Sequence, residues 1–343
     1  MICGEIRTRL LPASRPLSGA AAAELLALRT DERVRVSERP NHYAVSPDVL
    51  TGVDVRLPAD LGPRVRAVGT LAARAVLTGG RVLQSSARFH CQATGPDRRQ
   101  PWGHYLLRPG AVEPIGSLQA AASARSFLAG ASRADGPDLG IGVVAERLPA
   151  ALLRHRLLDQ RPPFRAAQTR LRWAAWLAAD GEGPSIESFT LAEDGLRTVA
   201  LRVPPGTPPI VVAALCEDLA LHDWLLTTLA RMVDRAESRA AVGPTVVTLL
   251  RPAIEHLVHL WLPGARVDPG LDPVWATLER SPAFSRQWLI LVQRVRDQLA
   301  LHSLPMPPGS ALPDPAGHPR PDTPDTTASR QRRRHPPRPS REL

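Results

Sequence analysis

Over residues 1–115, short apolar stretches alternate with polar residues and are broken by Gly and Pro, a pattern that predicts β-strands. Gly79 and Gly80 lie between two such stretches and favour the positive φ angles of a tight hairpin turn. One helix is expected over 19–29, with Ser18 as its N-cap. This N-terminal region is therefore predicted to be β-rich.

The pattern then changes twice. Residues 116–160 are rich in Ala and Leu and are predicted to be helical, with a loop over 132–137. Residues 165–205 return to alternation, with turn signals at Asp180-Gly181 and Asp194-Gly195. We interpret this region as a small antiparallel meander of three strands.

Beyond the prolines at 204 and 205, apolar residues recur at helical spacing, which predicts a helical bundle over 208–304. The expected helices cover 209–236, 245–262 and 284–303. Residues 305–343 contain many prolines and arginines and few large apolar residues, so this tail is expected to be disordered. The predicted fold class is α+β, with the β-rich half, the meander and the bundle as separate regions.

The amino-acid composition argues against several classes of enzyme and binding site. All 43 basic residues are arginine and the net charge is +10. A chain without lysine cannot form a Schiff base or supply the lysine of a P-loop. The cysteines Cys3, Cys91 and Cys216 form no CxxC pair, which argues against a disulfide framework or a cysteine zinc site. No signal peptide or membrane span is evident, and a cytoplasmic location is expected.

The spelling GxGxxA at Gly140, Gly142 and Ala145 matches a dinucleotide-binding turn, but a polar loop precedes it where that motif needs a strand. We interpret it as the N-terminus of a helix and predict no cofactor. His90 and Cys91 are adjacent on a predicted strand and so point to opposite faces of the sheet. They are not expected to act as a base and a nucleophile, and Cys91 is expected to be buried.

Asp218 and His222 are the catalytic candidates. The four-residue spacing makes them neighbours on a helix, with Asp218 near the edge and His222 near the centre of the apolar stripe. They form either a satisfied core pair or part of a site, and in both cases they should be hydrogen-bonded. The next helix adds Glu255, His256 and His259, but Glu255 and His259 project away from its apolar stripe, so no metal site is predicted.

Candidate binding residues lie elsewhere. Trp224 projects away from the apolar stripe, where it would either cap another element of the same domain or anchor a partner. Arg39, His42 and Tyr43 gather in one predicted loop that could bind anions, and a second such loop covers 98–105.

Five segments resemble a family of uncharacterised actinomycete (Streptomyces-type) proteins with no assigned activity. They are ICGEIR (2–7), RVSERP (35–40), AVSPDVLTGVD (44–54), ALCEDLALHDWLLTT (214–228) and RDQLALH (296–302). The resemblance excludes the tail and implies work in a multiprotein bacterial system.

The residues do not converge on a catalytic constellation, so we expect a non-catalytic interaction or accessory component with a protein partner. Two alternatives stay open. One is an enzyme, for example a hydrolase, that uses Asp218 and His222 with Arg39 and His42. The other is weak nucleic-acid binding through arginines, including the run over 330–334.

Overall fold

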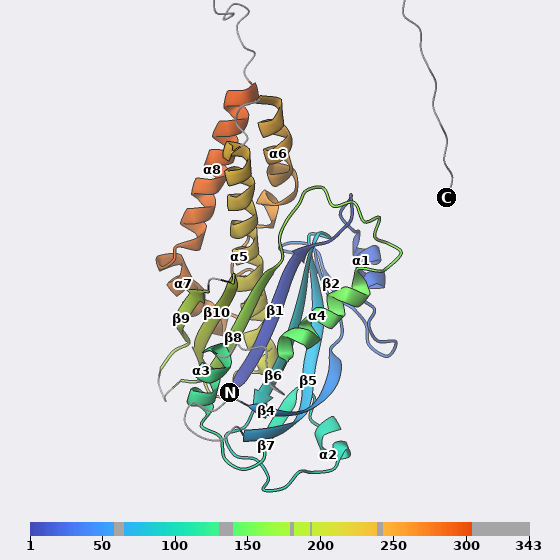
Figure 1. Ribbon diagram of the computed structural model, residues 1–343, viewed down its shortest axis with the longest axis vertical. Helices are drawn as coiled ribbons and strands as arrows, with labels where there is room; N and C mark the ends of the chain where they lie inside the picture. Colours follow the sequence, from blue (N-terminus) through green and yellow to red (C-terminus); the bar gives the residue numbers. More distant parts are fainter. Residues whose placement is uncertain (58–64, 130–139, 179–181, 193, 239–242, 304–343) are drawn as a thin grey trace, which may run out of the picture. The chain divides into compact units, whose positions relative to one another are not determined.

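The computed structural model of the chain describes residues 1–57, 65–129, 140–178, 182–192, 194–238 and 243–303. Within these ranges ten strands form one mixed sheet, and helices pack on both of its faces (Figure 1). The architecture is α+β, with a β-rich N-terminal half and C-terminal helices, as predicted. Residues 1–304 form one compact unit, so the regions that we separated by composition belong to the same body.

The strands are β1 (Ile2–Leu10), β2 (Arg35–Ser37), β3 (Tyr43–Val45), β4 (Val49–Leu57), β5 (Val65–Thr78), β6 (Val82–Cys91), β7 (Ala111–Pro114), β8 (Thr169–Leu177), β9 (Ser185–Leu191) and β10 (Leu196–Val203). Their order across the sheet is β2-β3-β5-β7-β6-β1-β8-β10-β9, and β4 also pairs with β5. Because β1 lies antiparallel to both β6 and β8, it joins the N-terminal strands to the later ones.

The prediction of an antiparallel meander over 165–205 is wrong in its pairing, although the three strands lie where they were expected. β10 runs parallel beside β8, with Val199 opposite Trp173, and β9 pairs with the far side of β10. The burial pattern supplies the reason: the apolar face of β10 joins the core next to β8, whereas β9 is mostly exposed and lies at the edge of the sheet.

The helices are α1 (Gly19–Leu25), α2 (Trp102–Leu106), α3 (Ala120–Ala129), α4 (Ile141–Leu152), α5 (Pro209–Ser238), α6 (Gly243–His256), α7 (Asp272–Arg280) and α8 (Phe284–Ser303), with short 3-10 turns at Val258–Leu260 and Pro269–Leu271. Adjacent residues of β8 show that the sheet separates two cores. Trp173 packs with α5 and the other C-terminal helices, whereas Ala174 packs with α3 and α4 on the opposite face.

Several local predictions are confirmed. The Oγ of Ser18 accepts the Ala21 N–H at 3.3 Å, so Ser18 caps α1, which ends at Leu25, before the predicted residue 29. Gly79 and Gly80 have φ angles of +59° and +62° in the hairpin that joins β5 to β6. α5 and α8 match their predicted ranges, whereas α6 ends at His256, before the predicted residue 262, and α7 was not predicted.

Two further sequence predictions concern the C-terminal tail and membrane-spanning helices. The tail over 305–343, predicted to be disordered, lies outside the described residues. Among the described helices, none combines the length and the apolar character that crossing a membrane requires.

Candidate functional site

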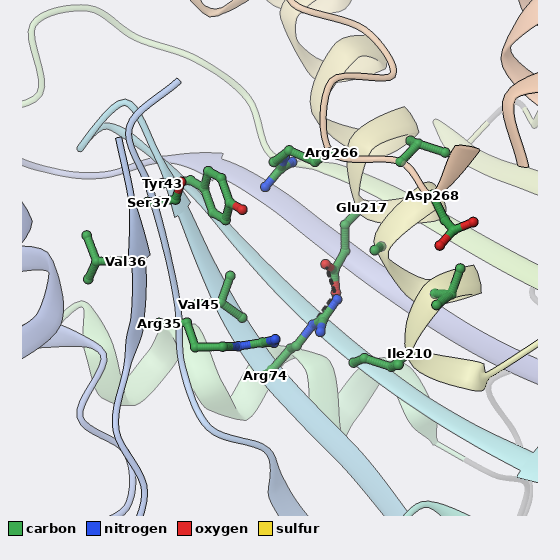
Figure 2. A pocket seen from close by; sticks show the side chains of 13 residues that line it. Arg35, Val36, Ser37, Tyr43, Val45, Arg74, Ile210, Glu217, Arg266 and Asp268 are labelled. Carbon is green, nitrogen blue, oxygen red and sulfur yellow. Dashed lines mark hydrogen bonds and ion pairs between the residues drawn. The ribbon is translucent and has the colours of Figure 1, made fainter. Parts of the chain in front are cut away.

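A cleft of about 410 Å³ lies beside the first turns of α5, and we call it the arginine cleft (Figure 2). Strands β2, β3 and β5 form one side, and α5 with the segment 266–268 forms the other. Its charged lining residues are Arg35, Arg74, Glu217, Arg266 and Asp268. Its apolar lining residues are Val36, Val45, Ile210, Val211, Ala214 and Val267. This volume suits a small organic molecule or one side chain of a partner.

The floor of the arginine cleft is an ion pair between Arg74 of β5 and Glu217 of α5. The Nε and Nη2 of Arg74 donate to the two carboxylate oxygens at 2.8 and 2.6 Å, and both side chains are 4% exposed. The Glu217 carbonyl also accepts the Gln84 amide at 2.7 Å, which fixes this turn of α5 on the sheet. Paired in this way, Arg74 and Glu217 largely cancel each other's charge.

Of the two largely buried cations in the arginine cleft, Arg266 is less well compensated than Arg74. Its Nε lies 3.6 Å from Oδ1 of Asp218, which is beyond normal hydrogen-bond length, and its side chain is 13% exposed. The Nη2 atom is buried without a hydrogen-bond partner among the described residues. The guanidinium stands 5.3 Å from the centre of the Tyr43 ring, a cation–π contact that replaces only part of the lost hydration.

The remaining charges leave the arginine cleft positive. Arg35 is exposed, and Figure 2 shows its side chain reaching toward Arg74. Oδ1 of Asp268 accepts the Gly270 N–H at 2.9 Å, and its carboxylate points away from Arg266 in the same view. The N-terminus of α5, the positive end of the helix dipole, lies at Pro209 beside the cleft. An anionic group with an apolar neighbour therefore fits this lining.

The predicted anion-binding loop contributes one of its three residues to the arginine cleft. Tyr43 lines the cleft beneath Arg266. Arg39 is exposed outside the cleft. His42 projects to the other side, where its Nε2 would lie 3.2 Å from a Cβ at Gly19 of α1. His42 directly precedes β3, which begins at Tyr43.

The sequence did not single out Arg35, Arg74 or Arg266. A signal was present for Arg74, because it is the one charged residue in the run Ala72–Leu77, and a charge inside an otherwise apolar strand must have a buried partner. Arg266 offered no such signal, since it follows Gly264 in a segment that reads as an ordinary loop.

Asp218 and His222 are both about 1% exposed, and neither lines the arginine cleft. The predicted hydrogen bond is present, but it runs from His222 Nδ1–H to the main-chain carbonyl of Asp218 at 2.7 Å, while the nearest carboxylate oxygen is 3.6 Å away. Trp261 and Trp275 flank the imidazole edge to face, with ring centres 4.9 and 5.4 Å distant. The pair is therefore enclosed in the core.

This enclosure predicts a dependence of stability on pH. Burial lowers the pKa of His222 below its usual 6.5, so the imidazole is neutral in the folded protein. The unfolded chain takes up the proton more readily, so stability present above pH 6.5 should be lost as the pH falls, at up to about 1.4 kcal/mol per unit. Urea unfolding at pH 7.5 and 5.5 measures this loss. The loss should be smaller in His222→Phe but nearly intact in His256→Gln, whose imidazole is less buried. Equal losses in the wild type and His222→Phe would contradict this assignment.

The second histidine cluster, Glu255, His256 and His259, lies at the end of α6 and in the 3-10 turn that follows. The Glu255 and His259 side chains lie on the outer part of the bundle, as projection predicted, and the His256 ring stacks on Phe164 with centres 6.3 Å apart. Among the described residues, no group of three or more His, Cys, Asp or Glu side chains is placed to hold a metal ion.

The hypothesis that Trp224 anchors a partner is wrong. The side chain is 0% exposed, and its Nε1–H donates to the Ala167 carbonyl at 2.9 Å. Trp224 thus caps another element of the same unit, which was the alternative. The projection failed because α5 lies between the sheet and the other C-terminal helices, so more than one of its faces is buried.

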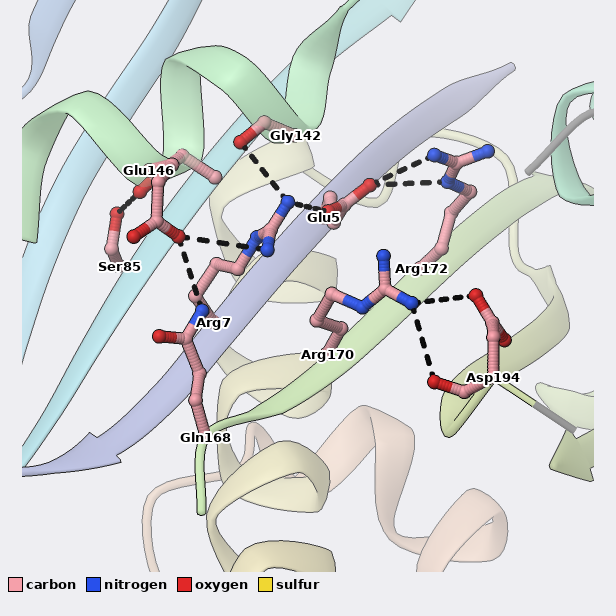
Figure 3. A network of polar contacts seen from close by, with 10 residues as sticks. Glu5, Arg7, Ser85, Gly142, Glu146, Gln168, Arg170, Arg172 and Asp194 are labelled. Carbon is pink, nitrogen blue, oxygen red and sulfur yellow. Dashed lines mark hydrogen bonds and ion pairs between the residues drawn. The ribbon is translucent and has the colours of Figure 1, made fainter. Parts of the chain in front are cut away.

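The close packing of helix α4 on β1 explains the GxGxxA sequence. Helix α4 begins at Ile141, as predicted, and the Gly142 carbonyl accepts the Arg7 Nη2 at 3.4 Å (Figure 3). A Cβ at Gly142 would lie 2.6 Å from a carboxylate oxygen of Glu5, so glycine permits α4 to approach β1 closely. Glu5 pairs with both Arg7 and Arg172 at 3.0 Å, and Arg7 also lies 3.5 Å from Glu146, so two carboxylates face these two arginines.

Two further predictions concern the thiol of Cys91 and the second predicted loop, over 98–105. Cys91 is 3% exposed and burial raises its pKa to about 12, so the thiol is inert beside His90. In the second predicted loop the Tyr105 ring is buried, and His104 Nε2 contacts the Glu113 carboxylate at 2.9 Å. This segment, whose second half belongs to helix α2, therefore packs on β7 and is separate from the arginine cleft.

Comparison with protein-family models, curated protein sequences and solved structures finds no match to this chain.

Proposed function

We propose that this protein is a non-catalytic interaction component that uses the arginine cleft to bind an anionic group, a carboxylate or a phosphate, with an apolar neighbour. The observation that carries the proposal is Arg266, a largely buried cation whose Nη2 has no hydrogen-bond partner among the described residues and whose nearest carboxylate is 3.6 Å away. Buried donors without partners are costly, and an entering anion would satisfy them.

The resemblance to the actinomycete family supports action within a multiprotein bacterial system. The anion would then belong either to a partner protein, as an acidic side chain, or to a small molecule. Action in the cytoplasm is part of the same proposal. The free, buried thiols of Cys3, Cys91 and Cys216 support it, since an oxidising compartment favours disulfides.

The two alternatives have less support. An enzyme built on Asp218 and His222 would need a substrate to reach groups that are about 1% exposed. Nucleic-acid binding would need free guanidinium groups, yet many described arginines pair with carboxylates. Examples are Arg29, Arg66, Arg88, Arg170 and Arg202. The arginine run over 330–334 lies outside the described residues.

Calorimetry with hexanoate, inorganic phosphate and the peptide acetyl-Val-Glu-Val-amide tests the proposal, with hexylamine as the cationic control. The wild type should bind the anions and not hexylamine. Tighter binding of the peptide than of hexanoate would favour a partner protein as the source of the anion, and the reverse would favour a small molecule.

Arg266→Gln should weaken anion binding by about tenfold or more, because a charge-assisted hydrogen bond contributes about 1.5–3 kcal/mol. Arg66→Gln is the matched control, since Arg66 is exposed on β5 and pairs with Asp54 at 2.7 Å, outside the arginine cleft. Absence of binding in the wild type, or equal weakening by both substitutions, would refute the proposed function.

A further inference from the structure

Asp218 lies behind the wall of the arginine cleft and makes three contacts there. Its Oδ2 accepts the Gly264 N–H at 2.8 Å, and its Oδ1 lies 3.6 Å from Arg266 Nε. Its main-chain carbonyl accepts the His222 Nδ1–H at 2.7 Å. Asp218 therefore holds the segment that carries Arg266 and also faces the charge of Arg266.

The tether to Gly264 fixes where this segment runs. Gly264 has a φ of +76°, a conformation that other residues rarely adopt, and a Cβ there would lie 3.4 Å from Trp275 Cδ1. The segment enters the arginine cleft directly after this turn, with Arg266 and Val267 among the lining residues. The hydrogen bond from Gly264 to Asp218 thus anchors the start of one wall.

The charges of Asp218 and Arg266 are only partly matched. Asp218 is 1% exposed and receives one main-chain N–H on its carboxylate, with the cation offset at 3.6 Å. A buried ion pair compensates its own desolvation only when its geometry is close and its hydrogen bonds are complete. Here neither condition holds, so Arg266 keeps donor capacity for a second anion.

We propose that Asp218 is a positioning residue that sets the anion affinity of the arginine cleft, holding Arg266 in place while competing with the ligand for its charge. This inference rests on the proposed function. It gives the Asp218 and His222 pair a role other than catalysis: His222 fixes the helical turn of Asp218, and Asp218 determines how strongly Arg266 attracts an anion.

Asp218→Asn separates the two parts of this role, because the amide oxygen can still accept the Gly264 N–H while the negative charge is lost. Hexanoate and phosphate should bind about tenfold more tightly than to the wild type, since the competing charge at Arg266 is gone. Asp218→Ala loses both charge and tether and should bind more weakly than Asp218→Asn. A purely structural role of Asp218 would not tighten binding.

Asp223→Asn is the matched control. Asp223 lies on the same helix, is largely buried and pairs with Arg197 at 2.7 Å, but it does not line the arginine cleft. Its substitution should leave anion binding at the wild-type level. If the wild type binds hexanoate, Arg266→Gln weakens that binding and Asp218→Asn matches Asp223→Asn, this inference is overturned while the proposed function stands. If the wild type binds neither probe, the proposed function itself fails.

If Asp218→Asn does not fold, an NMR titration of the wild type still tests the inference. The Gly264 amide and the Arg266 Nε–H share Asp218, so both NMR resonances should shift with one midpoint during a hexanoate titration. A Gly264 amide that does not move at saturation would overturn the inference.

Discussion

Glu217→Gln is expected to lower the free energy of unfolding by about 3–5 kcal/mol. Glu217 accepts two charge-assisted hydrogen bonds from Arg74 at 2.8 and 2.6 Å, and both side chains are 4% exposed. The neutral amide would leave the Arg74 guanidinium buried without its counter-charge. Guanidinium chloride unfolding of the wild type and the variant, with the slope of the transition checked for change, measures the loss.

Glu113→Gln is the matched control for this experiment. Glu113 is also buried and also pairs with an arginine, but its partner Arg108 has a side chain that is 52% exposed and can be rehydrated when the charge is removed. The loss should therefore be clearly smaller. The double substitution Arg74→Met with Glu217→Leu should recover most of the stability, since it leaves no unpaired charge. Equal losses at Glu217 and Glu113 would show that burial of the arginine is not the cause.

Local elements were predictable from the sequence because their signals are local. Apolar spacing identified the long helices over 209–236 and 284–303, and a capping Ser or a Gly-Gly turn located α1 and the hairpin of β5 and β6. The pairing of distant strands has no such signal. That β1 lies between β6 and β8, and that β10 rather than β9 lies beside β8, depends on which apolar faces fit against α5, and this is decided only when the whole sheet forms.

The residues of the arginine cleft likewise had no local signal in the sequence that would bring them together. Its cations come from β2, β5 and the segment 266–268, and each is an arginine in a sequence where all basic residues are arginine. Residue type alone therefore could not distinguish these three arginines from the other arginines of the chain. Tyr43 could be selected because it stands with Arg39 and His42 in one predicted loop, and it is the one of these three residues that lines the cleft.

Asp218 and His222 could be selected for the converse reason, since a charged residue at the edge of an apolar stripe and a histidine at its centre are rare. The sequence could not decide what they do. That required the position of Gly264 and Arg266, which follow Asp218 by more than forty residues and return to it only through the packing of the bundle.

Trp224→Ala is expected to destabilise the protein by about 3–5 kcal/mol, the usual cost of removing a fully buried aromatic side chain. The indole is 0% exposed and joins the core formed by α5, the sheet and the other C-terminal helices. The substitution would also leave the Ala167 carbonyl without its donor. Thermal and denaturant unfolding measure the effect.

Two further variants separate the contributions of Trp224. Trp224→Phe keeps most of the ring but removes the N–H, and it should cost about 1–3 kcal/mol, the penalty for an unsatisfied buried acceptor plus a small void. Trp102→Ala removes a tryptophan that is 39% exposed and lies beside Arg99, so its loss should be below about 1 kcal/mol. A Trp224→Ala protein with wild-type stability would mean that this indole is not part of the core, and the partner-anchor hypothesis would return.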